Sequence, residues 1–172
     1  TLDVARVHVP DGAARDLAPE EVARILDHSD ERLRLAITMM AQMGLRVGDL
    51  ARARIEDIDM RRRSLHVRAK GGRGEPTHWE PIPGEAWALL SRHLRQRSAA
   101  TGPVIQNHWT GDHVTPGWLS RQIREVMFTA GVKVSSGDGI SAHSLRHTCA
   151  QHMIDSGADL REVQRALGHR TL

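Results

Sequence analysis

The segment from residue 30 to residue 43 constrains the fold most, because a helix built from it is apolar on most sides. The large apolar residues in this segment include Leu33, Leu35, Ile37, Met39 and Met40. A helix that is apolar all round is stable only when other elements surround it. We therefore expect it near the centre of the molecule, with Gly44 as its stop signal.

The rest of the chain predicts a mainly α fold with a small antiparallel β-sheet (α+β). Apolar residues at helical spacing predict helices from about 17 to 26, 85 to 98, 116 to 130, 143 to 155 and 159 to 167, and a short helix after Gly44. Residues 53–59, 64–69 and 77–83 predict strands, with 70–75 as a hairpin loop and prolines at the edge. We expect one domain over residues 17–172, preceded by a linker or arm over residues 1–16.

The charge of the chain favours a polyanionic partner. The sequence pI is about 9.9, and the basic residues are 22 arginines but only two lysines, Lys70 and Lys133. A G+C-rich genome alone can produce this excess of arginine. A guanidinium nevertheless matches phosphate oxygens in a bidentate way, so nucleic acid is a natural partner.

Two further features bear on the cellular location. One cysteine excludes an internal disulfide and is typical of a reducing compartment. The sequence has no apolar run of membrane-spanning length and no signal-peptide pattern. We therefore expect a cytoplasmic protein with no membrane partner.

The stretch SAHSLRHTCAQHM, residues 141–153, concentrates groups that can do chemistry. His143 and His147 have the i,i+4 spacing of a metal clamp, whereas His143 and Arg146 have an i,i+3 spacing that suits a phosphate at a helix N-terminus. The fixed cation of Arg146 disfavours a metal ion in the same turn. A surface ion pair beside partly buried histidines is the structural alternative. We expect no metal, and we expect His147 and His152 mainly to pack.

Other segments strengthen the phosphate interpretation. In GLRVGDL, residues 44–50, Arg46 stands at a predicted helix start and Asp49 follows at i+3, where its carboxylate can orient the guanidinium. Lys70 lies in the predicted hairpin loop, and a lysine can give up a proton where an arginine cannot. His169 follows the last predicted helix.

Taken in their order along the chain, these short motifs resemble those of the tyrosine recombinases, a family that includes the phage integrases. The matching residues are Gly44-Leu45-Arg46 with Asp49, Lys70-Gly71, His143-x-x-Arg146-His147 and Leu167-Gly168-His169. The resemblance covers about residues 17 to 172 and implies the catalytic domain of that family, which is mainly α with a small β-sheet. It implies site-specific DNA recombination without a nucleotide cofactor or metal, on duplex DNA, by copies of the protein assembled in a tetrameric synapse.

The resemblance also implies a role for each residue. Arg46 and Arg146 would bind the scissile phosphate, and Lys70 would protonate the leaving 5′ oxygen. His143 would act as acid or base, and His169 would occupy the second histidine position. Asp49 would give acidic support.

The family nucleophile is a tyrosine that forms a 3′-phosphotyrosyl link, and the 172 residues contain no tyrosine. We expect it beyond Leu172, so the chain as printed is expected not to cleave DNA. Cys149 is expected to fill the core rather than to act as a nucleophile. The alternatives are a type IB topoisomerase-like enzyme, a non-catalytic DNA-binding regulator of the same fold and, third, a metal-dependent hydrolase.

Overall fold

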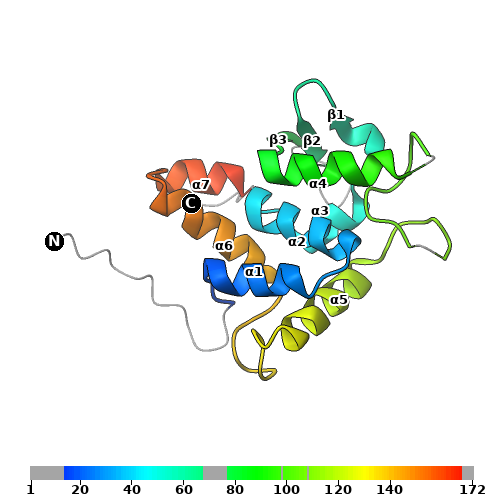
Figure 1. The fold of residues 1–172 in the computed structure, drawn as a ribbon. Helices are drawn as coiled ribbons and strands as arrows, with labels where there is room; N and C mark the ends of the chain where they lie inside the picture. The colour runs from blue at the N-terminus through cyan, green and yellow to red at the C-terminus, as the bar shows by residue number, and fades with distance from the viewer. Residues whose placement is uncertain (1–13, 68–76, 98, 108, 168–172) are drawn as a thin grey trace.

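The computed structural model describes residues 14–67, 77–97, 99–107 and 109–167, and it confirms a mainly helical fold with one small antiparallel sheet (Figure 1). The elements in order are α1 (Pro19–Asp27), α2 (Glu31–Met43), α3 (Val47–Arg52), the 3-10 helix η1 (Ile55–Asp57), β1 (Ile58–Asp59), β2 (Ser64–Val67), β3 (His78–Pro81), α4 (Gly84–Arg95), α5 (Pro116–Thr129), α6 (Ala142–Asp155) and α7 (Leu160–Ala166). None of the helices in the described ranges has the length and apolar character that a membrane crossing requires.

Helix α2 is the centre of the core, as its apolar sequence predicts. It contacts five other helices, namely α1, α3, α4, α5 and α6 (Figure 1). The Asp30 carboxylate accepts a hydrogen bond from the Leu33 backbone N–H at 2.7 Å and so caps the first turn. At the other end Gly44 adopts a left-handed conformation with φ 64°, which ends the helix.

The sheet has the strand order β1-β2-β3, and both pairings are antiparallel. Pro81 lies in β3, at the edge of the sheet, where a missing N–H is tolerated. The strand predicted over residues 53–59 is wrong except for Ile58–Asp59. The Ile55 N–H donates to the Gly102 carbonyl at 2.8 Å, so this backbone pairs with a distant loop instead of the sheet. The predicted hairpin loop 70–75 lies outside the described residues.

The loop before α6 is held by an ion pair between a buried lysine and a partly buried aspartate. The Lys133 ammonium, 5% exposed, lies 2.6 Å from the Asp138 carboxylate and also donates to the Ile140 carbonyl at 2.7 Å. The same carboxylate accepts hydrogen bonds from the backbone N–H groups of Val134, Ser135 and Ile140. These contacts fix the point at which α6 begins.

Candidate active site

Arg46 stands in the sharp turn between α2 and α3. The left-handed Gly44 reverses the chain, and Arg46 then adopts an extended conformation as the N-cap of α3. Its side chain is 52% exposed, so the guanidinium is available to a ligand. The GLR sequence therefore produces a turn that presents an arginine at the surface.

Arg146 approaches the same turn from α6, but it is buried, with 5% of its surface exposed. Its guanidinium donates hydrogen bonds to the carbonyl oxygens of Gly44 and Leu167, so it ties α6 to the ends of α2 and α7. Burial, followed by the nearby charge of Arg46, lowers the pKa of Arg146 to about 10. The group is still a cation at neutral pH.

The two arginines line one open pocket of about 650 Å³, part of which is open to solvent. Its walls come from α2, α3, α5 and the start of α6, and are formed by Met40, Leu45, Arg46, Val47, Gly48, Ser120, Ser141, Ala142, His143 and Arg146. The N-terminus of a helix carries partial positive charge. Two guanidiniums and the start of α6 therefore converge on a site for an anion.

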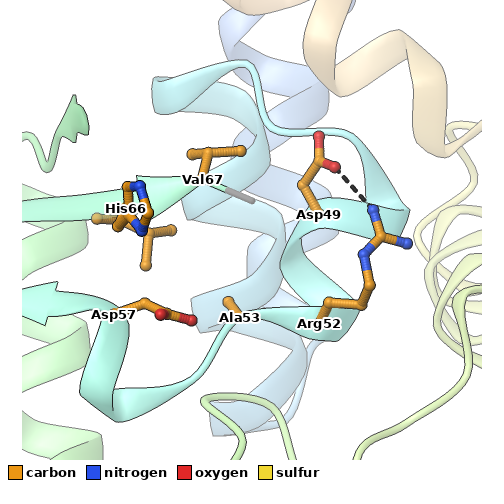
Figure 2. Close-up of a pocket in the computed structure, with 7 residues that line it drawn as sticks. Asp49, Arg52, Ala53, Asp57, His66 and Val67 are labelled. Atoms are coloured by element: carbon orange, nitrogen blue, oxygen red, sulfur yellow. Dashed lines mark hydrogen bonds and ion pairs between the residues drawn. The ribbon is translucent and has the colours of Figure 1, made fainter. Parts of the chain in front are cut away.

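Asp49 supports this pocket from α3, and a second arginine holds it in place. One carboxylate oxygen lies 3.9 Å from Nη1 of Arg46, and the other accepts a hydrogen bond from Nη2 of Arg52 at 3.0 Å. Figure 2 shows the ion pair of Asp49 and Arg52. Both residues line a smaller cavity of about 230 Å³ between α3 and β2, together with Asp57 and His66 among others. The shorter contact is with Arg52, so Arg52 orients the carboxylate that faces Arg46.

The sequence and the fold have counterparts in known proteins. The family model described as "Phage integrase family" matches residues 15–172. The chain belongs to this family. The tyrosine recombinase XerA of Pyrococcus furiosus is 30% identical over 169 residues, which are 95% of this chain and 56% of the relative. The chain thus spans about half the length of that curated relative.

Solved structures of the integrase family share the fold. The crystal structure of a XerA recombinase superimposes with a TM-score of 0.81 at 24% identity, over 96% of this chain and 58% of that one. The structure of a lambda integrase tetramer bound to a Holliday junction superimposes with a TM-score of 0.73 at 22% identity, over 99% of this chain and 50% of that one. At these identities the likeness shows the fold.

The histidines of α6 differ from the prediction in one respect. His143 is exposed at the pocket, and its ring lies 4.9 Å from that of His147 in an edge-to-face contact. His147 and His152 are both exposed, so the prediction that they pack is wrong. His152 lies in the last turn of α6, where Ile154 is also 40% exposed.

Cys149 is buried, as predicted for a core filler of this integrase domain. Burial, followed by the charge of Glu80, raises the pKa of its thiol to about 11. The group is therefore a thiol rather than a reactive thiolate at neutral pH.

Two predicted site residues, Lys70 and His169, lie outside the described residues, so their roles stay predictions. Sequence reasoning missed two groups: Arg52, which bonds to Asp49, and Glu80, whose charge acts on Arg146. Arg52 follows Asp49 at i+3, a spacing that indicates an ion pair on a helix. Glu80 is the second of two polar residues at i,i+2 in β3, a spacing that places both on one face of the strand.

Proposed function

We propose that the protein carries out site-specific DNA recombination of the integrase type, by cleaving and rejoining strands through a 3′-phosphotyrosyl intermediate. The observation that carries the proposal is the convergence of Arg46 and Arg146, from positions 100 residues apart, on one open pocket at the start of α6. Membership of the phage integrase family supports the reaction class.

The proposed chemistry depends mainly on charge. A phosphodiester in the transition state carries extra negative charge on its non-bridging oxygens, and Arg46 and Arg146 would meet that charge in a preorganised pocket. Loss of one such donor typically costs about 2.7–4 kcal/mol of transition-state stabilisation. His143, at the rim of the same pocket, would move a proton as acid or base.

The remaining roles complete the proposal. Lys70 would protonate the leaving 5′ oxygen, and His169 would support the phosphate from the segment after α7. Asp49 would keep Arg46 in place. We propose that residues 17–172 form this catalytic domain, that residues 1–16 form a linker or arm, and that the domain acts in the cytoplasm.

Duplex DNA is the proposed substrate, and further copies of the protein are the proposed partners. Of the family structures compared above, lambda integrase is a tetramer bound to a Holliday junction. A strand exchange needs four strand cleavages, so a synapse of four copies suits the chemistry of one nucleophile per copy.

A nicked suicide substrate tests the proposal. The reaction needs a tyrosine, and the 172 residues contain none. The assay therefore compares this chain with one extended by the codons that follow in the gene. We expect a covalent protein–DNA adduct with the extended chain alone, and its loss when the added tyrosine becomes phenylalanine. DNA binding without an adduct from the extended chain would indicate a non-catalytic regulator, and an adduct from the 172-residue chain would refute the tyrosine nucleophile.

A further inference from the structure

A third arginine lies beside the pocket that Arg46 and Arg146 share. Arg52 is the last residue of α3, the helix whose N-cap is Arg46. A helical side chain leans back toward the N-terminus of its helix, so the guanidinium of Arg52 lies over the preceding turn. Figure 2 shows this side chain running back along α3 to Asp49. The guanidinium therefore approaches the end of α3 at which Arg46 stands.

Gly48 leaves room for this guanidinium, and Gly48 itself lines the pocket. A Cβ added at position 48 would lie 3.2 Å from Nη1 and 3.5 Å from Nη2 of Arg52. A side chain there would compete for the space against which the guanidinium now lies. The charged end of Arg52 therefore packs against a residue of the pocket wall.

One carboxylate lies between the two exposed arginines. Oδ1 of Asp49 accepts a hydrogen bond from Nη2 of Arg52 at 3.0 Å, while Oδ2 lies 3.9 Å from Nη1 of Arg46. A phosphate placed between Arg46 and Arg52 would meet this carboxylate, and like charges repel strongly at short range. The two arginines therefore suit two different phosphates.

The guanidinium of Arg52 keeps donors for a ligand. Its side chain is 39% exposed. Nη2 bonds to Asp49, whereas Nη1 makes no hydrogen bond within the ranges of the chain that the structure describes. In Figure 2 the terminal nitrogen that is not bonded to Asp49 is directed away from it. A guanidinium with free donors can bind the oxygens of a phosphate.

The charge at this turn is larger than one phosphodiester can balance. Arg46, Arg52 and Arg146 supply three positive charges, and the Asp49 carboxylate compensates one of them. A single backbone phosphate carries one negative charge, which leaves one positive charge over. A DNA strand supplies the next phosphate after about 3.4 Å of helix axis. Two neighbouring phosphates of one strand would therefore balance the three arginines and Asp49.

We propose that Arg52 is a phosphate-binding residue, which contacts a DNA backbone phosphate next to the one that Arg46 and Arg146 share. The proposal rests on the proposed function, since that function supplies duplex DNA as the ligand. The contact is a charge-assisted hydrogen bond, so no bond of the phosphate is formed or broken. Asp49 holds Arg52 in place for this contact.

The salt dependence of DNA binding tests the proposal, because each phosphate neutralised contributes about −0.9 to the slope of log K against log salt concentration. Fluorescence anisotropy with a duplex oligonucleotide should give Arg52→Gln a slope less negative than that of the wild type by about 0.9. Arg92→Gln is the matched control, since Arg92 is 50% exposed and lies 3.5 Å from Glu31. Glu31 begins α2 and Gly44 ends it, about 20 Å away. The control should keep the wild-type slope.

A double variant shows whether Arg52 binds a phosphate of its own. Arg46→Gln combined with Arg52→Gln should make the slope less negative by about 1.8, the sum for two phosphates. A double variant with the slope of Arg46→Gln alone would overturn the proposal, because Arg52 would then act only through Arg46. Equal changes in Arg52→Gln and Arg92→Gln would also overturn it, since they would report only the net charge of the protein.

Arg52→Lys distinguishes an effect of charge from an effect on the fold. Lysine binds phosphate as a point charge, so this variant should keep the wild-type slope. A slope changed by about 0.9 in Arg52→Lys as well would contradict a contact that depends on charge.

The wild type separates this proposal from the proposed function. A wild-type affinity that is independent of salt would refute duplex DNA as the ligand, and both proposals would fail. A salt-dependent wild type together with an unchanged slope in Arg52→Gln would refute the Arg52 contact alone.

Discussion

The two arginines that the sequence predicts as a pair have different surroundings. Arg146 is buried and bonded to two main-chain carbonyl oxygens, whereas the side chain of Arg46 is half exposed and held by Asp49 at 3.9 Å. Arg146 therefore stabilises the fold as well as facing the pocket. Arg46 contributes its charge to the pocket at little structural cost.

Replacement by lysine should separate these roles. Arg146→Lys should lower the free energy of unfolding by about 1–3 kcal/mol, since an ammonium cannot reproduce the planar fork that reaches the Gly44 and Leu167 carbonyls. Arg46→Lys should change it by less than about 0.5 kcal/mol. Urea unfolding followed by circular dichroism measures both values. Equal losses in the two variants would contradict a structural role specific to Arg146.

At the scale of elements, single residues set where the helices begin and end. The sequence predicts α2 and its stop because a run of apolar residues and a glycine are local signals. The prediction from sequence fails at residues 53–57, where the alternation of apolar and polar residues in ARIED resembles that of a strand. The structure bonds this segment to the loop at Gly102, a contact between residues far apart in the chain that periodicity cannot reveal.

The turn at Gly44 gives a test of helix-end geometry. Gly44→Ala should lower the free energy of unfolding by about 1–2 kcal/mol for the positive φ alone, and by more because the added Cβ would lie 2.5 Å from Cδ2 of Leu167. Gly117→Ala, in α5 with open space around it, should instead be neutral or stabilise by up to about 1 kcal/mol. Thermal unfolding of the wild type and the two variants measures these changes in stability. A stable Gly44→Ala would show that α2 and α7 are not packed closely at this turn.

The loop before α6 gives a test with a defined pH dependence. Burial acts to raise the pKa of Asp138, but Lys133 and three backbone N–H groups outweigh it and lower the pKa below the ordinary value of 3.8. Since the pKa is depressed in the folded state, this stabilisation is fully present above about pH 4 and is lost as pH falls further.

Asp138→Ala should therefore lower the free energy of unfolding by about 3–5 kcal/mol at pH 7, because it leaves the Lys133 ammonium buried without its counter-charge. Its deficit relative to wild type should shrink below pH 4. Asp27→Ala, at the exposed end of α1, serves as the control and should stay within about 0.5 kcal/mol of wild type. Denaturant unfolding at pH 7 and pH 3 gives these differences, and a deficit that does not change with pH would refute the ion pair as its cause.

At the scale of the whole molecule, part of the site follows from the sequence and part does not. Arg46, His143 and Arg146 stand in motifs whose order predicts a shared pocket, and the structure brings these three side chains to one cavity. The burial of Glu80 depends on how the sheet packs in the folded chain, which is a tertiary relation. Arg52 carries an ordinary helical ion-pair spacing, which alone does not mark a residue as part of a site.

The charge of the whole surface predicts how DNA binding responds to salt. The 172-residue chain should bind duplex DNA weakly and with little sequence preference. Each phosphate it neutralises should contribute about −0.9 to the slope of log K against log salt concentration. Arg46→Gln should make the slope less negative by about 0.9, because it removes one phosphate contact. Fluorescence anisotropy over a range of salt concentrations measures the slope, and an affinity that is independent of salt would count against DNA as the partner.

The central claim is that Arg46 and Arg146 share one DNA phosphate. A crystal structure of the chain with a short duplex oligonucleotide measures this most directly. We predict a backbone phosphate in the pocket at the start of α6, with oxygens about 2.7–2.9 Å from both guanidiniums. A duplex seated on another face of the domain, with neither guanidinium in contact with a phosphate, would contradict the account.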